Sequence, residues 1–172
     1  MRYWQAVSAA VFVSALLAGC GRPKMTDSSI APDETVDGAK IYAANCMVCH
    51  GADGKGLANV FPPLAGTDWV KGPPRRLIAL TLDGLNGPEK VYGVVYRGMM
   101  PAWRYSLNDQ KIAAVLTYVR QEWGNNASPV SALEISQLRM ETEARKIFWT
   151  DKELMEMEAA GKPVSTPADK GK

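Results

Sequence analysis

Residues 46–50 read Cys46-Met47-Val48-Cys49-His50, and this stretch decides which fold we expect. Two thiols three positions apart can add to the two vinyl groups on one edge of a porphyrin, and the adjacent histidine can bind the iron. The C-x-x-C-H pattern therefore predicts covalent attachment of one haem c through Cys46 and Cys49. A redox-active dithiol would be expected in a βαβ context, and a zinc site would need about four Cys or His ligands. The chain shows no βαβ pattern and holds only three cysteines and one histidine, so both alternatives are disfavoured.

The only histidine, His50, also limits the second axial ligand of the iron. Once His50 takes one axial position, the other must belong to a different residue type, to water or to nothing. Methionine is the usual partner in haems that only carry electrons. Met100 is the candidate, because Pro101 pushes it towards an extended backbone while Gly98 lets the chain turn just upstream. Its neighbour Met99 has the ordinary alternative role of a packed apolar side chain.

Length, composition and charge exclude several other classes of protein. The 172 residues allow one compact domain with appendages, and 47% of them are hydrophobic, too many for a wholly disordered chain. Lysine and arginine number 20 against 18 aspartates and glutamates, a net charge of +2. This balance does not favour a nucleic-acid binder, which shows a concentrated basic face.

Residues 36–124 resemble the class I c-type cytochromes, a resemblance that covers about half of the chain. Gly38 and Tyr42 lie in a segment that matches the first helix of the family. Residues 62–66 (PPLAG) resemble the family loop in which a proline carbonyl accepts the N–H of the proximal histidine, and residues 98–103 (GMMPAW) resemble the axial-methionine loop. The resemblance implies that Pro62 is that proline and that His50 and Met100 are the axial ligands.

The same resemblance and the apolar periodicity predict an all-α cytochrome c fold, with three to five helices around the haem. Apolar residues recur at helical spacing between residues 107 and 123, after the plausible N-cap Asn108 and before the stop signal at 124–126. Residues 75–82 and 88–97 are expected to form two shorter helices. Four arginines are candidate partners for the haem propionates, and the sequence does not choose among them: Arg75, Arg76, Arg97 and Arg104. Trp69 and Trp103 could border the porphyrin or belong to the ordinary core.

The N-terminus carries a second short motif. An apolar stretch from residue 6 to 18 follows Arg2, and it is too short for a comfortable membrane span. It ends in Leu17-Ala18-Gly19-Cys20, which resembles the lipobox of bacterial lipoproteins. The resemblance implies removal of residues 1–19, lipidation of Cys20 and a flexible tether over residues 20–35. Plain secretory cleavage is the alternative.

The C-terminal residues 127–172 lie outside the cytochrome pattern and are expected to form a helical extension of the domain at 36–126. Two capping boxes, at residues 131–134 and 150–153, predict helices that start near 132 and 151. The first helix has a thin apolar stripe, Ile135 and Leu138, and should pack on the haem domain or on another protein. Residues 161–172 are expected to be disordered.

These features indicate an electron carrier and not an enzyme, because a haem with two protein ligands leaves no position for a substrate. We expect a lipoprotein anchored in the bacterial cell envelope, facing the periplasm or the exterior, as a subunit or docked partner of a respiratory complex. The architecture resembles the monohaem lipoprotein subunit of alternative complex III, a quinol-oxidising assembly. Alternatives are a free-standing lipoprotein shuttle to an oxidase or a periplasmic dehydrogenase, and a haem peroxidase or gas sensor. Neither a nucleic acid nor a small-molecule substrate is expected.

Overall fold

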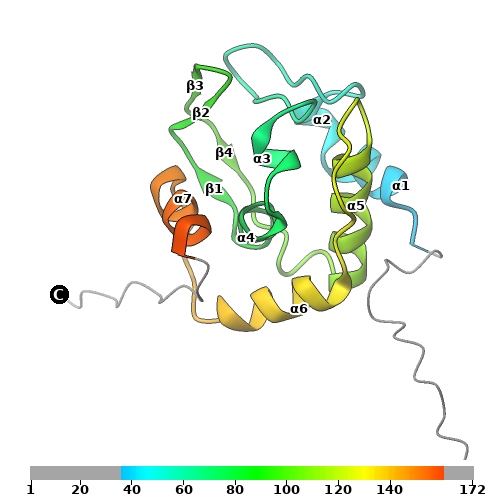
Figure 1. Cartoon of the computed structure of the whole chain (residues 1–172), viewed down its shortest axis with the longest axis vertical. Coiled ribbons are helices and arrows are strands. Elements are labelled where there is room, and N and C mark those ends of the chain that lie inside the picture. Colours follow the sequence, from blue (N-terminus) through cyan, green and yellow to red (C-terminus); the bar gives the residue numbers. More distant parts are fainter. Residues whose placement is uncertain (1–35, 161–172) are drawn as a thin grey trace, which may run out of the picture.

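The first five helices and two small sheets form a domain that contains a cavity, and the last two helices pack on the outside of this domain (Figure 1). The computed structural model describes residues 36–160; the expected leader, lipidated Cys20, tether and C-terminal end lie outside these residues. The elements are α1 (Gly38–Asn45), α2 (Met47–His50), α3 (Asp68–Lys71), α4 (Pro74–Asp83), β1 (Leu85–Asn86), β2 (Glu89–Val91), β3 (Val94–Tyr96), β4 (Met99–Met100), α5 (Asp109–Gln121), α6 (Ala132–Glu141) and α7 (Asp151–Ala160).

Helices α1 and α5 cross closely and form one wall of the molecule. A Cβ on Gly38 would lie 2.3 Å from the carbonyl oxygen of Ala114, so only glycine allows this approach. Asn108 caps α5 as expected, because its side chain accepts a hydrogen bond from the Lys111 amide at 2.9 Å. The apolar face predicted for this helix is buried against the core.

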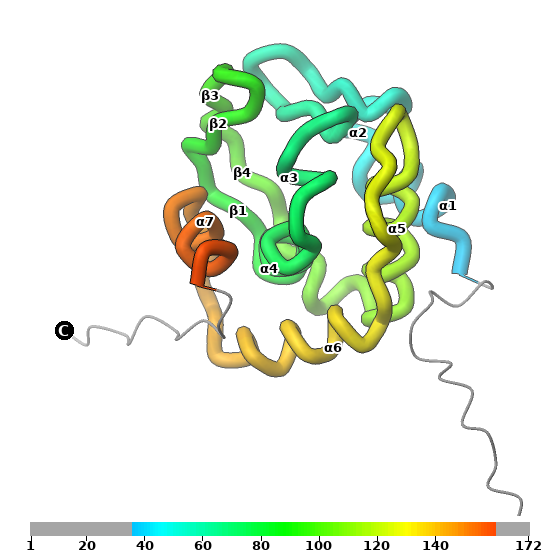
Figure 2. The backbone as a smooth tube through the Cα atoms, viewed as in Figure 1, coloured from blue at the N-terminus to red at the C-terminus, as the bar shows by residue number. Residues whose placement is uncertain are grey.

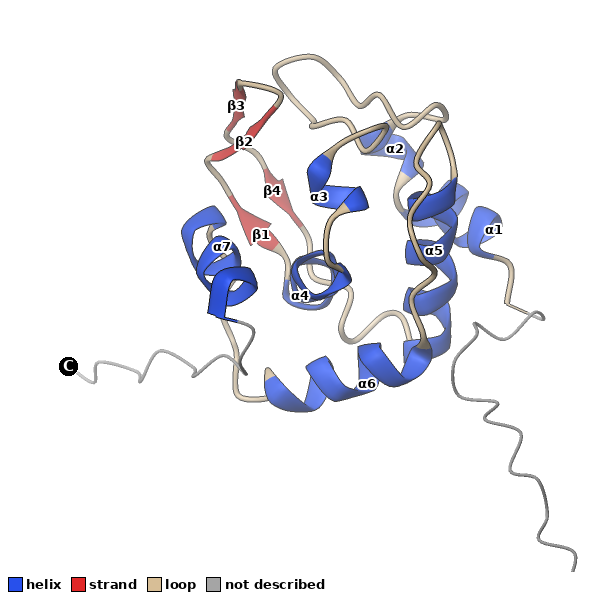
Figure 3. Cartoon of the chain, viewed as in Figure 1, coloured by secondary structure: helices blue, strands red, loops and turns tan. Residues whose placement is uncertain are grey.

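The expected helix over residues 88–97 is wrong, because this segment forms the antiparallel hairpin of β2 and β3 (Figure 3). The run from Val91 to Tyr96 consists mainly of β-branched and aromatic residues, which favour strands. Tyr92 and Gly93 form the turn with φ of 51° and 82°, the two positive values that a tight hairpin turn requires. The described residues are therefore mainly helical but not all-α. The helix expected over residues 75–82 is confirmed as α4, Pro74–Asp83.

The second sheet pairs β1 with β4, and the C-terminal extension joins it. Leu85 pairs with Met100 in this antiparallel sheet and also forms a parallel bridge with Trp149, which is fully buried. The Trp149 amide donates to the Gly84 carbonyl at 3.0 Å, and the Asn86 amide donates to the Trp149 carbonyl at 2.8 Å. The extension thus bonds to β1, the strand that pairs with the strand of Met100.

Both helices predicted for the extension form where their capping boxes place them. Ser131 and Glu134 exchange hydrogen bonds at the start of α6, and Thr150 and Glu153 do the same at the start of α7. The α6 helix passes along α5 and α4, and α7 then returns beside α4 (Figure 2). Ile135, Leu138 and Leu154 are buried in the common core, so the extension packs on the domain. No helix among residues 36–160 is long and apolar enough to cross a membrane.

Candidate haem site

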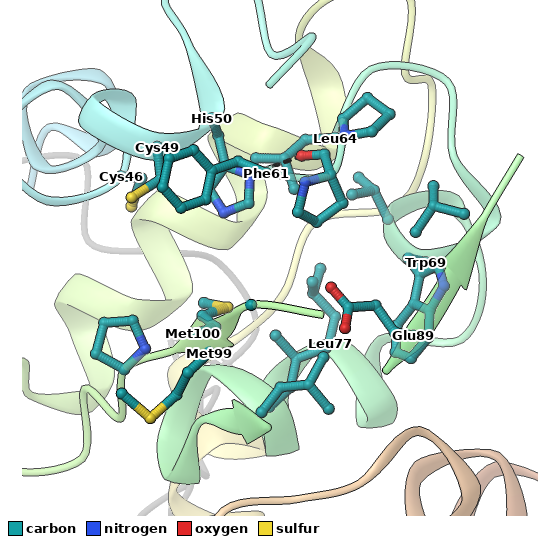
Figure 4. A pocket seen from close by; sticks show the side chains of 18 of the residues that line it. Cys46, Cys49, His50, Phe61, Leu64, Trp69, Leu77, Glu89, Met99 and Met100 are labelled. Atoms are coloured by element: carbon teal, nitrogen blue, oxygen red, sulfur yellow. Dashed lines mark hydrogen bonds between the residues drawn. The ribbon is translucent and has the colours of Figure 1, made fainter. Parts of the chain in front are cut away.

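The two thiols of the C-x-x-C-H motif lie together at one edge of the central cavity (Figure 4). Cys46 caps the C-terminus of α1, and Cys49 lies in the single turn of α2. Both cysteines are half-buried free thiols. Burial, together with the neighbouring Cys49, raises the pKa of Cys46 to about 11, so this side chain is a neutral thiol at physiological pH. Two neighbouring thiols at the edge of an apolar cavity are placed for attachment to the vinyl edge of a porphyrin.

His50 follows the thiols, and its ring is oriented by the backbone of the next loop. Nδ1 of His50 lies 3.0 Å from the carbonyl oxygen of Pro62. The partner of the imidazole is therefore Pro62 and not the adjacent Pro63. Burial lowers the pKa of His50, while the Pro62 carbonyl acts in the opposite direction. A neutral imidazole that donates its Nδ1–H to this carbonyl leaves the lone pair of Nε2 available for a metal.

The loop that carries Pro62 is held by hydrogen bonds from three parts of the chain. The Gly56 amide donates to the His50 carbonyl at 2.8 Å, and the Leu64 amide donates to the Gly54 carbonyl at 2.7 Å. From beyond α5, the side-chain oxygen of Asn125 accepts from the Gly66 amide at 2.7 Å. These bonds fix the position of the carbonyl that orients the imidazole.

Met100 lies across the cavity from His50 (Figure 4). Its strand β4 is extended, so adjacent side chains point to opposite faces. Met99 is 58% exposed, whereas Met100 is half-buried and packs against the core. Met100 is thus the more buried of the two neighbouring methionines, and both border the cavity.

The space between His50 and Met100 is an apolar cavity of about 280 Å³. Its walls are formed mostly by hydrophobic side chains, with both tryptophans of interest among them: Val48, Val60, Phe61, Leu64, Trp69, Val70, Leu77, Leu80, Leu85, Val91 and Trp103. A flat apolar macrocycle fits such a cavity, because an imidazole, a thioether and two thiols are placed for its iron and its vinyl edge. The residues present therefore fit a haem c.

None of the four candidate arginines lines this cavity. Arg104 instead forms a buried ion pair with Asp83, with Nε 2.6 Å from the carboxylate. Arg76 pairs with Glu158 of α7 at 2.7 Å. Arg75 pairs with Glu141 of α6, and Arg97 is exposed. Three of the arginines thus bind acidic side chains, two of which belong to the C-terminal extension.

One polar residue of the cavity wall, Glu89, was not anticipated from the sequence. Glu89 lies on β2, inside the segment that was expected to be a helix, and it is only 6% exposed. The available signal was the β-branched and aromatic composition of residues 91–96, which favours strands but does not mark Glu89 as buried. Burial raises the pKa of Glu89, and Asp151 at the start of α7 adds to this effect.

Comparison with known proteins gives one family and several relatives. The family model described as cytochrome c oxidase, cbb3-type, subunit III matches residues 33–119. Cytochrome c-552 of Thermus thermophilus is 39% identical over 112 residues, which are 60% of this chain and 84% of that protein. The cytochrome c subunit of the quinone alcohol dehydrogenase of Gluconobacter oxydans is 37% identical over 105 residues, 59% of this chain and 22% of that subunit. The gluconate 2-dehydrogenase cytochrome c subunit of Pantoea cypripedii is 35% identical over 113 residues, 62% of this chain and 25% of that subunit.

Proposed function

The chain belongs to the c-type cytochrome family of the cbb3-type oxidase subunit III, and we propose that it is a membrane-tethered carrier of single electrons with His50 and Met100 as axial ligands. As a member of this family it holds haem c covalently, through Cys46 and Cys49. The bound haem supplies an iron that cycles between the ferric and ferrous states. The observation that carries the proposal is the placement of Met100 opposite His50 in an apolar cavity.

The residues of the cavity favour electron transfer over catalysis. A haem iron held by His50 and Met100 would have no free position, so a substrate such as peroxide would have to displace a ligand. The Pro62 carbonyl keeps the imidazole in one orientation, and the apolar walls keep water from the metal. Little reorganisation then accompanies gain or loss of an electron.

The proposed axial ligand can be tested by replacing each of the two neighbouring methionines with alanine. Met100→Ala should abolish the weak long-wavelength absorption band of sulfur-to-iron charge transfer. It should also lower the reduction potential, because axial ligand identity contributes to a range of about 0.8 V among haem proteins. Met99→Ala is the matched control and should keep both band and potential, since Met99 is 58% exposed although it also borders the cavity. Loss of the band in Met99→Ala alone would assign the ligand to Met99, and its retention in both variants would contradict a methionine ligand here.

The proposed anchor is a lipid on Cys20, and the proposed setting is the bacterial cell envelope with the haem domain facing the periplasm or the exterior. The support is the Leu17–Cys20 pattern, which resembles a lipobox. The lipidated cysteine of a lipoprotein carries several acyl chains, and these anchor a protein stably where a single chain binds weakly. Cys20→Ser should move the haem domain from the membrane fraction to the soluble fraction. A variant that stays bound to membranes after a high-salt wash would contradict the lipid anchor.

We further propose that the carrier works as a subunit or docked partner of a respiratory assembly, such as a quinol-oxidising alternative complex III. The support is that several relatives are named as cytochrome c subunits of dehydrogenases. A free-standing shuttle is the second candidate, and the relative named simply cytochrome c-552, of which this chain covers 84%, favours it. Gentle solubilisation of membranes followed by native electrophoresis separates the two: haem that migrates in a large complex supports the assembly, and haem at the mass of the single chain supports the shuttle.

A further inference from the structure

Glu89 places a carboxyl group inside an otherwise apolar cavity. Its side chain points into the cavity beside Trp69, at the end away from Cys46 and Cys49 (Figure 4). The residue is 6% exposed, and its Oε2 has no hydrogen-bond partner among the described residues. The amide of Glu89 itself interacts with the carboxyl group and acts to lower its pKa, but burial outweighs this effect. A buried carboxylate oxygen without a partner is costly, and a proton or a bound group at Oε2 would satisfy it.

The charged neighbours of Glu89 make its ionised form still less favourable. Asp151 on α7 is the acidic residue that acts on it, and the pKa of Asp151 is itself raised by burial. On β3 the paired residue is the neutral Tyr96, while Lys90 on the same strand is exposed. Arg76 of α4 acts on Asp151 and forms its ion pair with Glu158. Asp151 thus adds like charge near Glu89, and the cavity wall contains no arginine or lysine.

The haem c that the family requires brings further negative charge to this end of the cavity. The vinyl groups and the propionates of a haem occupy opposite edges of the porphyrin. A haem held at its vinyl edge by Cys46 and Cys49 would direct its propionate edge towards Trp69 and Glu89, which line the opposite end of the cavity. A protonated Glu89 could donate a hydrogen bond there, whereas an ionised one would face like charge.

We propose that Glu89 is a redox-linked proton-binding site of this cytochrome. When the redox partner delivers one electron, the cavity loses one positive charge, and Glu89 takes one proton from solvent. When the electron leaves, the ferric charge again favours the carboxylate, and Glu89 releases the proton. Each cycle of reduction and oxidation therefore binds and releases one proton for one electron. The inference rests on the proposed function, since it requires that the haem carries electrons.

The test is the pH dependence of the midpoint potential of the haem-loaded protein. In the wild type, the equilibrium constant for reduction should fall up to tenfold per pH unit where Glu89 ionises, which is 59 mV for a one-electron couple. This window should lie above the usual carboxyl range, because the pKa of Glu89 is raised. Glu89→Gln has nearly the same shape and should have no slope in that window. Glu122→Gln changes an exposed glutamate of the same chain and should keep the wild-type slope.

A second substitution distinguishes loss of the titrating carboxyl group from disruption of the fold. Glu89→Asp retains a carboxyl that can titrate, so it should keep a slope, in a shifted window. An unchanged slope in Glu89→Gln would overturn the proposal, and so would a flat profile in Glu89→Asp. Failure of the proposed function looks different: the wild type would then show no reversible one-electron couple, or no band from the methionine ligand.

Discussion

At the scale of single residues, the ion pair of Arg104 and Asp83 is the most consequential contact outside the haem site. Both side chains are only 6% exposed, and Arg104 also donates to the Arg139 carbonyl at 3.0 Å. A further short hydrogen bond joins Arg104 to Thr142. Arg104 was a candidate partner of the haem propionates, but it instead joins the segment after β4 to both α4 and α6.

Arg104→Leu should therefore destabilise the protein strongly. The change leaves the Asp83 carboxylate buried without its partner, and breaking a buried pair in this way costs about 3–5 kcal/mol. The free energy of unfolding, measured by denaturant titration of the haem-loaded protein, should fall by that amount. Arg97→Leu is the control, since Arg97 is exposed, and it should change the same quantity by less than about 0.5 kcal/mol. Equal effects in the two variants would contradict a structural role for the pair.

At the scale of elements, the start of α7 depends on one carboxylate. Oε2 of Glu153 accepts hydrogen bonds from the Thr150 amide at 2.8 Å and from Nη2 of Arg145 at 2.9 Å. Burial acts to raise the pKa of Glu153, but these bonds outweigh it and hold the pKa below its ordinary value. The same Arg145 lies 3.5 Å from the centre of the Trp149 ring, so the cap and the buried tryptophan share one contact.

The lowered pKa predicts how acid affects this element. A depressed carboxyl stabilises the fold at pH values above its unfolded-state pKa, and the contribution disappears as pH falls through the folded-state pKa. Wild type should thus be more stable than Glu153→Gln near neutral pH, and the difference should disappear as acid takes the pH down through the lowered pKa of Glu153. Thermal unfolding across this range measures it. Glu156→Gln, on the exposed face of the same helix, should show little difference at any pH, and a pH-independent gap for Glu153→Gln would contradict the cap's titration.

At the scale of the whole molecule, the extension and the haem domain share one core. Fully buried side chains of the extension include Ile135, Trp149 and Leu154, and they pack with the buried face of α4. Figure 2 shows the chain passing from α5 through α6 to α7 along one side of the domain. Burial of each such side chain contributes about 1.5–3 kcal/mol, a large share of a total stability of about 5–15 kcal/mol.

Ending the chain at residue 126 should therefore remove most of its stability. We expect a large fall in the unfolding midpoint together with weakening of the methionine band, because Trp149 also supports the strand that pairs with Met100. A chain that ends at residue 160 keeps every contact described here and should behave as the full chain. If the chain ending at 126 unfolded at the same midpoint with an intact band, the extension would be an independent unit.

Short motifs of the chain are enough to predict the covalent haem and the starts of the helices at 109, 132 and 151. The C-x-x-C-H pattern and the caps at Asn108 and Ser131 are local signals, because each depends on residues within four or five positions of one another. Tertiary structure alone decided that residues 89–96 form a hairpin, that Glu89 is buried, and which acids bind the arginines. These outcomes depend on partners far along the chain: Asp151 lies near Glu89, Trp149 beside Leu85, and Thr142 beside Arg104. Contacts between residues far apart in the sequence decide where short strands form and which charges are buried, so local periodicity does not predict them.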